Sequence, residues 1–361
     1  MSNHTKVALI TGIGGQDGSY LSEFLLKQGY KVRGIIRRAS SLNTHRIEHL
    51  VKKYGTAEDL NSPFLIVYGD VTDASSVRAI IEKVHPDEIY NLAAQSHVGI
   101  SFNNAASTIN INTLGTLRVL EALKDMGSKC KFYQASSSEM FGISPPPQNE
   151  TTPMLPQSPY GVSKLAAFHL IKLYRSAYDL FASNGILFNH ESPRRGYNFA
   201  TKKVTQTLAD ILVREQKELV MGNLDAKRDW GFSGDYVQAM HKILQHNIPD
   251  DFVIATGETH TVRDFIQESF LLVGLDYERF LKTNPKFKRP AEVPALLGDA
   301  SKARNILGWE PKVKFKDLVA MMVESDLKGN FEKKGIVPVK MGEQYTPGYF
   351  TNIGKELARK L

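Results

Sequence analysis

The sequence has little of several features that mark whole classes of protein. Its 361 residues include one cysteine, Cys130, which excludes a disulfide within the chain and is typical of a reducing compartment. No apolar run approaches the ~18 residues that a membrane span needs. The first residues lead directly into an apolar strand pattern, so we expect no signal peptide, no membrane association and a cytoplasmic location. We expect no metal site either.

Composition and charge argue against some classes of binding partner but do not specify a function. Hydrophobic residues at 42% and charged residues at 23% are ordinary values for a globular protein. The formal net charge of +7 could suit nucleic acid, but the basic residues are scattered and nowhere form a run of five. The alternating basic and aromatic platforms of single-strand binders are also absent. We therefore expect a small polyanionic ligand and no nucleic-acid partner.

A glycine-rich stretch near the amino terminus is the first positive signal. Val7 to Ile10 is an apolar run typical of a buried strand, and a helical pattern starts at Ser19. Glycine between a strand and a helix lets the backbone approach a pyrophosphate, and the unpaired N–H groups of the helix bind it. The stretch predicts a dinucleotide site, although glycines alone could form a turn without a ligand. The expected cofactor contacts here are Gly12, Gly15, Gln16, Asp17 and Gly18.

The end of the second predicted strand, Lys31–Ile36, indicates which dinucleotide is bound. Sites that choose NAD usually place an acidic residue at about this distance from the glycine loop, to hold the ribose hydroxyls. Here Arg37 and Arg38 stand instead, followed by Ser40. A guanidinium group matches a phosphate in two hydrogen bonds, so the sequence favours NADP. The alternative is that one arginine serves a solvated loop or a subunit contact.

Two further strand ends carry expected cofactor contacts. Strands are predicted at Phe64–Tyr68 and Asp87–Leu92, and the carboxyl ends of parallel strands face the ligand crevice of a doubly wound sheet. Asp70 could equally cap the helix that starts near Asp73. The small residues after the second of these strands would let the backbone lie against the cofactor. The expected contacts are Asp70, Val71, Leu92, Ala93, Ala94, Gln95 and Ser96.

Candidates for proton chemistry follow the fifth predicted strand, Lys131–Ala135. Ser137 and Glu139 come at its end, and a helix then opens with Tyr160 and Lys164. Residues four apart lie on one face of a helix, and an ammonium near a phenol lowers the pKa of the phenol. The pattern is common by chance, but its place after a glycine loop and Ser137 indicates one shared crevice.

The second half contains no further glycine-rich loop and no internal repeat. A sixth strand is predicted at Gly185–Asn189, where the cofactor domain is expected to give way to a substrate-binding part. Residues 330–361 are rich in lysine and glycine and suggest a peripheral tail. The predicted elements of this half are helices at Lys203–Glu215, Gly234–Gln245, Val262–Val273 and Phe315–Leu327, and strands at Leu219–Gly222 and Phe252–Ala255; in the first half, helices are also predicted over residues 42–60 and at Asn112–Met126.

Taken together, these motifs resemble the GDP-mannose 4,6-dehydratases, which are extended short-chain dehydrogenases/reductases. The resemblance covers roughly residues 5–325, and the Gly-Gln-Asp-Gly loop, the Asn-His-Glu-Ser-Pro-Arg-Arg stretch and Arg-Asp-Trp-Gly are its most specific parts. The matching segments are Thr11–Leu21, Arg37–Arg46, Leu92–Val98, Phe132–Glu139, Leu187–Gly196, Arg228–Gly231, Arg289–Val293 and Leu297–Lys302.

The resemblance implies an α/β fold in two parts and a reaction without net oxidation. Residues 1–190 would form a Rossmann domain with a doubly wound parallel sheet, to which later segments return. Residues 191–330 would form a smaller α/β domain for the GDP-sugar, and residues 331–361 the tail. A hydride would pass from C4 of the sugar to NADP and return to C6, while water is lost across C5 and C6. The product would be GDP-4-keto-6-deoxymannose.

The resemblance also implies roles for individual residues. Tyr160 would take the proton of the 4-hydroxyl, Ser137 would hydrogen-bond the C4 oxygen, and Lys164 would bind the nicotinamide ribose. Glu139 would remove the C5 proton, which an epimerase or a reductase would not require. Further cofactor contacts would be His190 and Arg195, and the GDP-sugar would meet Asn189, Lys203, Arg228, Arg289 and Glu292.

Several positions depart from the family pattern and leave the sugar open. Ser137 replaces a usual threonine, and Phe232-Ser-Gly234 stands where His-Ala-Lys is common. Tyr197, Ala200 and Pro294 also differ from the usual residues. A GDP-manno-heptose dehydratase, an epimerase or reductase of the same fold, and an idle NADP-binding regulator are the alternatives. Family members suggest a homodimer or homotetramer, with the loop from Arg38 to Arg46 near the cofactor of a neighbouring subunit.

Overall fold

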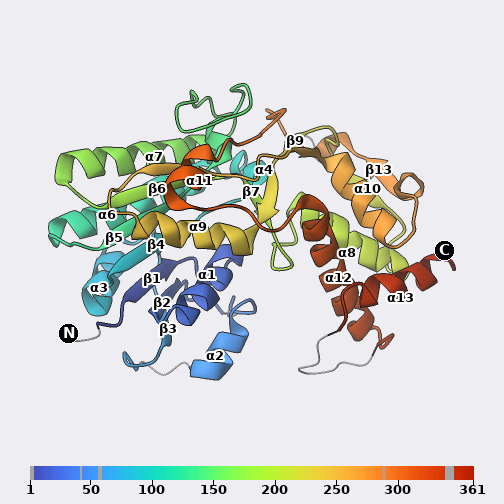
Figure 1. Ribbon diagram of the computed structural model, residues 1–361, viewed down its shortest axis with the longest axis horizontal. Helices are drawn as coiled ribbons and strands as arrows, with labels where there is room; N and C mark the ends of the chain where they lie inside the picture. The colour runs from blue at the N-terminus through green and yellow to red at the C-terminus, as the bar shows by residue number, and fades with distance from the viewer. Residues whose placement is uncertain (1–3, 41–42, 56–58, 288, 338–344) are drawn as a thin grey trace.

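A seven-stranded parallel sheet organises the larger part of the chain (Figure 1). The computed structural model describes residues 4–40, 43–55, 59–287, 289–337 and 345–361. The strand order is β11-β6-β5-β4-β1-β2-β3, so the order reverses between β1 and β4 as in a doubly wound fold. This arrangement confirms the predicted Rossmann-type sheet. Its strands are β1 Val7–Thr11, β2 Lys31–Ile36, β3 Phe64–Tyr68, β4 Glu88–Asn91, β5 Lys131–Ser137, β6 Ala182–Leu187 and β11 Asp251–Ile254.

Helices cover both faces of this sheet, because its strands are apolar on both sides. In β1, Ile10 packs with residues of α1 and α9, whereas its neighbour Leu9 packs with residues of α3, α6 and α7. Both side chains are completely buried or nearly so. The helices concerned are α1 Gln16–Lys27, α9 Ser233–Gln245, α3 Ala74–Val84, α6 Gly115–Asp125 and α7 Pro159–Tyr178.

A second, mainly helical core lies beside the sheet, on the side of the carboxyl terminus (Figure 1). It is built by α8 Ala200–Leu212, α10 Val262–Leu272, α12 Phe315–Lys333 and α13 Tyr349–Ala358. Three two-stranded sheets accompany this second core. They are β7 Asn189–Glu191 with β10 Trp230–Phe232, β9 Lys227–Arg228 with β12 His260–Thr261, and β8 Leu219–Met221 with β13 Leu281–Thr283. In the ranges that the structure describes, no helix combines the length and apolarity needed to cross a membrane.

Short elements complete the chain. They are α2 Glu48–Tyr54, α4 Val98–Ser101, α5 Ala105–Ile109, the π-helical turn η1 Asn110–Leu114, α11 Ser301–Leu307, and the 3₁₀ turns η2 Ser138–Met140, η3 Tyr277–Arg279 and η4 Pro285–Phe287.

Several predicted boundaries differ from the structure. β6 starts at Ala182 and ends at Leu187, so Asn189 begins a separate strand that pairs with β10. Of the last residues, predicted to form a peripheral tail, those of α13 pack against α8 and α12 and bury Phe350 in the second core. Beyond residue 190, α9 and β11 return to the large sheet.

Candidate active site

The predicted site residues gather at one edge of the large sheet, where its parallel strands end. The glycine loop follows β1, Arg37 and Arg38 follow β2, and Leu92–Ser96 follow β4. Ser137 is the last residue of β5, and Asn189 lies just beyond the end of β6. The order reversal between β1 and β4 opens the crevice in which such sheets bind ligands.

Close packing explains the two outer glycines of the loop. Gly12 has φ +70°, a left-handed conformation, and a Cβ there would lie 2.9 Å from the backbone nitrogen of Ala93. A Cβ on Gly18 would lie 2.6 Å from the carbonyl oxygen of Gly12. The hydroxyl of Thr11 accepts hydrogen bonds from the N–H groups of Leu92 and Ala93, both at 3.0 Å, and so fastens this loop to the end of β4.

The loop fits a dinucleotide pyrophosphate. Gly15 is the N-cap of α1, is exposed, and provides no side chain to cap the first turn. The N–H groups at the start of α1 are therefore available to an anion. Arg37, Arg38 and Ser40 are exposed after β2, and the Arg38 guanidinium carbon lies 5.9 Å from the centroid of the Tyr68 ring.

The side chains of Gln16 and Asp17 are engaged with β7 and α9. Asp17 accepts from His190 Nε2 at 2.8 Å and from Ser233 Oγ at 2.7 Å, and Gln16 Nε2 donates to Asp17 Oδ1 at 3.1 Å. Gln16 Oε1 accepts from Ser192 Oγ at 2.8 Å. The first turn of α1 is therefore linked to the segment that carries Asn189 and Arg195.

An ion pair forms the centre of this link. Nδ1 of His190 donates to the carbonyl of Phe188 at 2.7 Å while Nε2 contacts Asp17, so both ring nitrogens act as donors. Burial opposes both charges, but Asp17 raises the pKa of His190 above its ordinary value. Against the same burial, His190, together with the hydroxyl of Ser233 and the amide of Gln16, holds the pKa of Asp17 well below its usual range.

The predicted contacts after β3 and β4 lie at the same edge with local partners of their own. Asp70 accepts from the backbone N–H and the hydroxyl of Thr72, both at 2.8 Å, whereas Asp73 is the residue that caps α3. Val71 is buried against Gly115, at the start of α6. The amide of Gln95 bonds to His97 within the loop and to the hydroxyl of Thr108 on α5. Ala94 is half-buried and Ser96 is exposed.

Ser137, Tyr160 and Lys164 meet between β5 and α7. Ser158 caps α7 by accepting from the N–H of Gly161 at 3.0 Å, and Pro159 occupies the first helical position. This start buries Tyr160 and Lys164 one turn apart, and Tyr160 shares a hydrogen bond with the hydroxyl of Ser137. Lys164 Nζ donates to the carbonyl of Ala135 at 2.7 Å and lies 5.9 Å from the Tyr160 ring centroid.

The pKa of Tyr160 differs from the expectation that Lys164 lowers it. Burial raises it to about 12, against the hydrogen bond of Ser137 and with the repulsion of Glu139 in support. Burial also lowers the pKa of Lys164 to about 8. Because the carbonyl of Ala135 on β5 holds the ammonium, burial determines the direction of the shift in the pKa of Tyr160.

Glu139 lies beside the hydroxyl pair and faces a cationic group. It is buried, its N–H donates to Ser137 Oγ at 3.2 Å, and its Oε2 has no hydrogen-bond partner. Oε1 lies 3.5 Å from Nη1 of Arg289, whose own N–H donates to Glu292 at 3.0 Å. Arg228 is buried and donates to the carbonyls of Lys227 and Val293, both at 2.9 Å. An acceptor without a partner in a buried site suits a group that exchanges a proton with a ligand.

The remaining predicted residues border this region. The Oδ1 of Asn189 is buried without a partner. Lys203 Nζ lies 4.2 Å from the ring centroid of Phe287, and burial lowers the pKa of Lys203. Arg195 Nε lies 3.0 Å from Glu191, and its guanidinium carbon lies 3.7 Å from the Phe199 ring centroid.

The sequence reasoning missed three residues that shape the site. Arg46 donates to the carbonyls of Arg194 at 2.7 Å and Gly14 at 3.3 Å, and thus closes the loop after β2 over the glycine turn. Asp229 is fully buried and accepts from Thr256 and two backbone N–H groups, which orders the residue beside Arg228. The third, Ser233, is one of the departures from the family pattern, and it is buried with its hydroxyl on Asp17.

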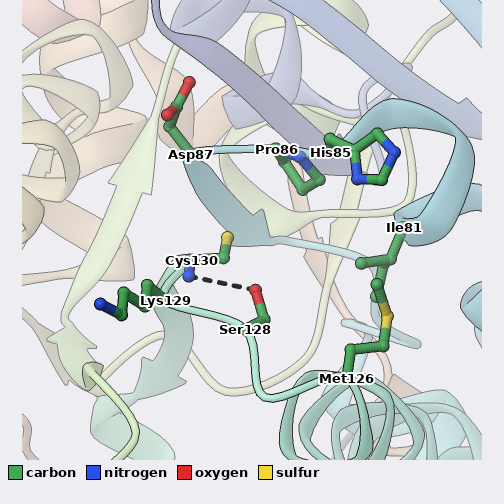
Figure 2. Close-up of a pocket in the computed structure, with 8 residues that line it drawn as sticks. All are labelled: Ile81, His85, Pro86, Asp87, Met126, Ser128, Lys129 and Cys130. Atoms are coloured by element: carbon green, nitrogen blue, oxygen red, sulfur yellow. Dashed lines mark hydrogen bonds between the residues drawn. The ribbon is translucent and has the colours of Figure 1, made fainter.

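Another cavity, of about 250 Å³, lies at the opposite edge of the sheet (Figure 2). Asp87 and Cys130, which precede β4 and β5, line it, and none of the predicted site residues does. Burial raises the pKa of the Cys130 thiol, which keeps it protonated and unreactive. Among the described residues, no group of three or more histidine, cysteine, aspartate or glutamate side chains could hold a metal ion.

Comparison with known proteins gives one consistent result. The sequence profile described as GDP-mannose 4,6 dehydratase matches residues 9–322. GDP-mannose 4,6 dehydratase 2 of Arabidopsis thaliana is 54% identical over 328 residues, which cover 90% of this chain and 87% of that protein. The human GDP-mannose 4,6 dehydratase is 49% identical, over 91% of this chain and 93% of that protein.

Solved structures share the fold at lower identity. UDP-glucuronic acid 4-epimerase of Bacillus cereus, in complex with UDP-glucuronic acid and NAD, has a TM-score of 0.77 and 25% identity over 89% of this chain and 99% of the other. The dTDP-glucose 4,6-dehydratase of Bacillus anthracis has a TM-score of 0.74 and 22% identity over 92% of this chain and 98% of the other.

Proposed function

The chain belongs to the GDP-mannose 4,6-dehydratase family, and we propose that it converts GDP-mannose to GDP-4-keto-6-deoxymannose with a bound NADP. The activity is that of a hydro-lyase on a nucleotide sugar. The observation that carries the mechanism is the presence of a hydroxyl, a phenol, an ammonium and a carboxylate in one crevice, with the carboxylate as the group that elimination requires in addition. Membership of the family supports GDP-mannose as the substrate, and the geometry of these four groups supports the elimination mechanism.

A nicotinamide dinucleotide fits the glycine loop and the sheet edge. The N–H groups at the start of α1 would bind its pyrophosphate, and Lys164 would move from the carbonyl of Ala135 to its ribose. Arg37, Arg38 and Ser40 are exposed, and among the residues that the structure describes no carboxylate forms an ion pair with either arginine; an arginine at this place would suit the 2′-phosphate of NADP. The chemistry that such a cofactor would supply here is acceptance of a hydride from C4 and its return to C6.

Tyr160 and Ser137 would handle the proton of the C4 hydroxyl. Because burial raises the pKa of Tyr160 to about 12, the phenol holds its proton at neutral pH. A positive charge brought beside the ring would favour the phenolate, which then removes the hydroxyl proton. Ser137, which already shares a hydrogen bond with Tyr160, would donate to the oxygen that becomes a ketone.

Glu139 would act on C5. A ketone at C4 acidifies the adjacent C–H bond, and a buried carboxylate can remove that proton and assist departure of the C6 hydroxyl as water. Its unpartnered Oε2 is the atom that supports this role. Arg289, now 3.5 Å from Oε1, would hold the carboxylate in place or bind the diphosphate.

Cationic side chains suit the GDP moiety, and two of them, Arg228 and Arg289, lie near Glu139. Arg228, Arg289 and Lys203 come from β9, a loop and α8, and Glu292 orders the backbone of Arg289. Asn189 adds an amide whose oxygen is free for a ligand. GDP-manno-heptose remains the alternative substrate, because the departures from the family pattern fall in this half.

We also propose a homo-oligomer. The apolar side chains of Ile109, Leu114, Val162 and Leu173 are 40–54% exposed on η1 and the helices next to it, and α7 packs directly beside η1 and α5. A second copy of this surface would cover them. Light scattering combined with size exclusion tests this, and a monomer at micromolar concentration would contradict it.

One incubation tests the reaction and the sugar together. The purified protein, with no cofactor added, receives GDP-mannose deuterated at C4 or GDP-manno-heptose, and the products are analysed by mass spectrometry. The proposal expects loss of one water from GDP-mannose and retention of the deuterium at C6. A product that keeps the mass of the substrate would indicate an epimerase, and stoichiometric release of reduced cofactor would indicate a dehydrogenase.

A further inference from the structure

The segment Phe232–Gly234 connects β10, in the predicted substrate-binding part, to α9. Helix α9 packs against α1, the helix that follows the glycine loop. Phe232 ends β10, which pairs with β7, and Ser233 is the first residue of α9. Ser233 is fully buried, and its hydroxyl donates to Oδ1 of Asp17 at 2.7 Å. Since α9 packs along α1 (Figure 1), this bond joins the first turns of two neighbouring helices.

Asp17 needs such a partner because of its location. Its carboxylate lies in the first turn of α1, at the helix end where an anionic pyrophosphate would bind. His190, Ser233 and Gln16 are its three donors, and together they hold the charge on the side of β7 and α9. Loss of one donor would leave this half-buried carboxylate less satisfied and would loosen the turn.

Phe232 and Gly234 reinforce the same junction. The Phe232 ring packs edge-on against Tyr20 of α1, with ring centroids 5.5 Å apart and an interplanar angle of 76°. A Cβ on Gly234 would lie 2.3 Å from Cε1 of that ring. Glycine at 234 therefore makes room for the aromatic ring at 232, and the two positions are coupled.

We propose that Ser233 is a positioning residue of the cofactor site: with the Phe232 ring that Gly234 admits, it locks the first turn of α1 to α9 and slows cofactor release. The proposal rests on the proposed function in one respect, that the glycine loop holds a nicotinamide dinucleotide.

Replacement of the hydroxyl tests the lock. In Ser233→Ala, the bound cofactor should dissociate about five- to tenfold faster, because the loop is no longer held in its binding conformation. The kcat at saturating cofactor should change less than twofold, since no reacting group is altered. The release rate is measured by dilution of the loaded protein into excess competing cofactor, followed by nicotinamide fluorescence.

A matched control separates positioning from general stability. Ser269→Ala removes an equally buried hydroxyl that donates within α10 to the carbonyl of Phe265 at 2.7 Å, far along the chain from the cofactor loop. Ser269→Ala should lower the melting temperature by about as much as Ser233→Ala does, and it should leave the rate of cofactor release unchanged. If Ser233→Ala does not fold, Phe232→Leu keeps the hydroxyl and should still accelerate release two- to threefold by loss of the contact with Tyr20, about 0.4–0.7 kcal/mol.

Two outcomes would overturn the proposal. One is cofactor release from Ser233→Ala at the wild-type rate, and the other is equal acceleration in Ser269→Ala. The test uses the ratio of variant to wild-type release for whichever nicotinamide dinucleotide the wild-type retains. It therefore stands apart from the product analysis with GDP-mannose, whose failure would refute the proposed function instead.

Discussion

Replacement of Glu139 by glutamine should stop the reaction between its oxidation and its elimination. The variant keeps the size of the side chain, and an amide oxygen can still face Nη1 of Arg289, which lies 3.5 Å from Oε1. It loses the ability to take a proton from C5. Ser137, Tyr160 and Lys164 are unchanged, so oxidation at C4 should proceed.

The expected loss of rate in Glu139→Gln follows from the role of Glu139 as a general base. Removal of a positioned base lowers a rate by about a hundred- to ten-thousandfold. At about 1.36 kcal/mol for each factor of ten, the barrier of the elimination rises by about 2.7–5.4 kcal/mol. Product formation should fall by that factor, while reduced cofactor accumulates to as much as one equivalent per site on mixing with GDP-mannose.

Stopped-flow absorbance and mass spectrometry of the quenched mixture measure both quantities. The matched control is Glu150→Gln, because Glu150 is a half-buried glutamate whose carboxylate accepts from the N–H of Val253 at 2.7 Å, on β11. The control should form product at nearly the wild-type rate and show no accumulation. Product formation by Glu139→Gln within threefold of wild type would refute the assignment of the base.

Three further substitutions probe other parts of the chain. Gly12→Ala should weaken cofactor binding more than tenfold in a fluorescence titration, since φ +70° costs an L-residue about 1–2 kcal/mol and the added Cβ meets backbone at 2.9 Å; unchanged affinity would contradict the close approach. The raised pKa of His190 means that its pairing with Asp17 stabilises the fold fully below the ordinary histidine pKa and loses this contribution as pH rises through the raised value. His190→Asn should therefore flatten the decline of the unfolding free energy as the pH rises above the ordinary histidine pKa, and urea titrations with the wild-type slope would argue against the pair. Lys202→Met should destabilise by about 3–5 kcal/mol, because it leaves Asp326 buried without its cation; Asp326→Leu added to it should recover stability, and a double variant as unstable as the single one would count against this reasoning.

The sheet could be predicted from sequence because local patterns determine it. β2 and β3 have the predicted bounds, since short apolar runs between glycine and polar turns carry a complete strand signal. The order of Ser137, Glu139, Tyr160 and Lys164 along the chain also sufficed to bring them together, because parallel strands end at one edge.

Other features depend on contacts that no local pattern records. α13 follows a stretch rich in lysine and glycine, and only its packing against α8 and α12 makes it part of a core. The pKa of Tyr160 could not be inferred from its spacing to Lys164, since the carbonyl of Ala135 takes the ammonium and burial then dominates. The contact of Ser233 with Asp17 spans 216 residues and required the tertiary structure.

The way the glycine loop is held agrees with a reaction that returns its hydride. An ordinary dehydrogenase must release its cofactor in every cycle, so a loop fastened at several points would slow turnover. Here the turn is fastened by Thr11 to β4, by Arg46 from the loop after β2, and by Asp17 to His190 and Ser233. If elimination at Glu139 intervenes between departure and return of the hydride, the cofactor has no reason to leave. The same fastening that would burden a dehydrogenase then protects a dehydratase from losing its reduced cofactor before the cycle is complete.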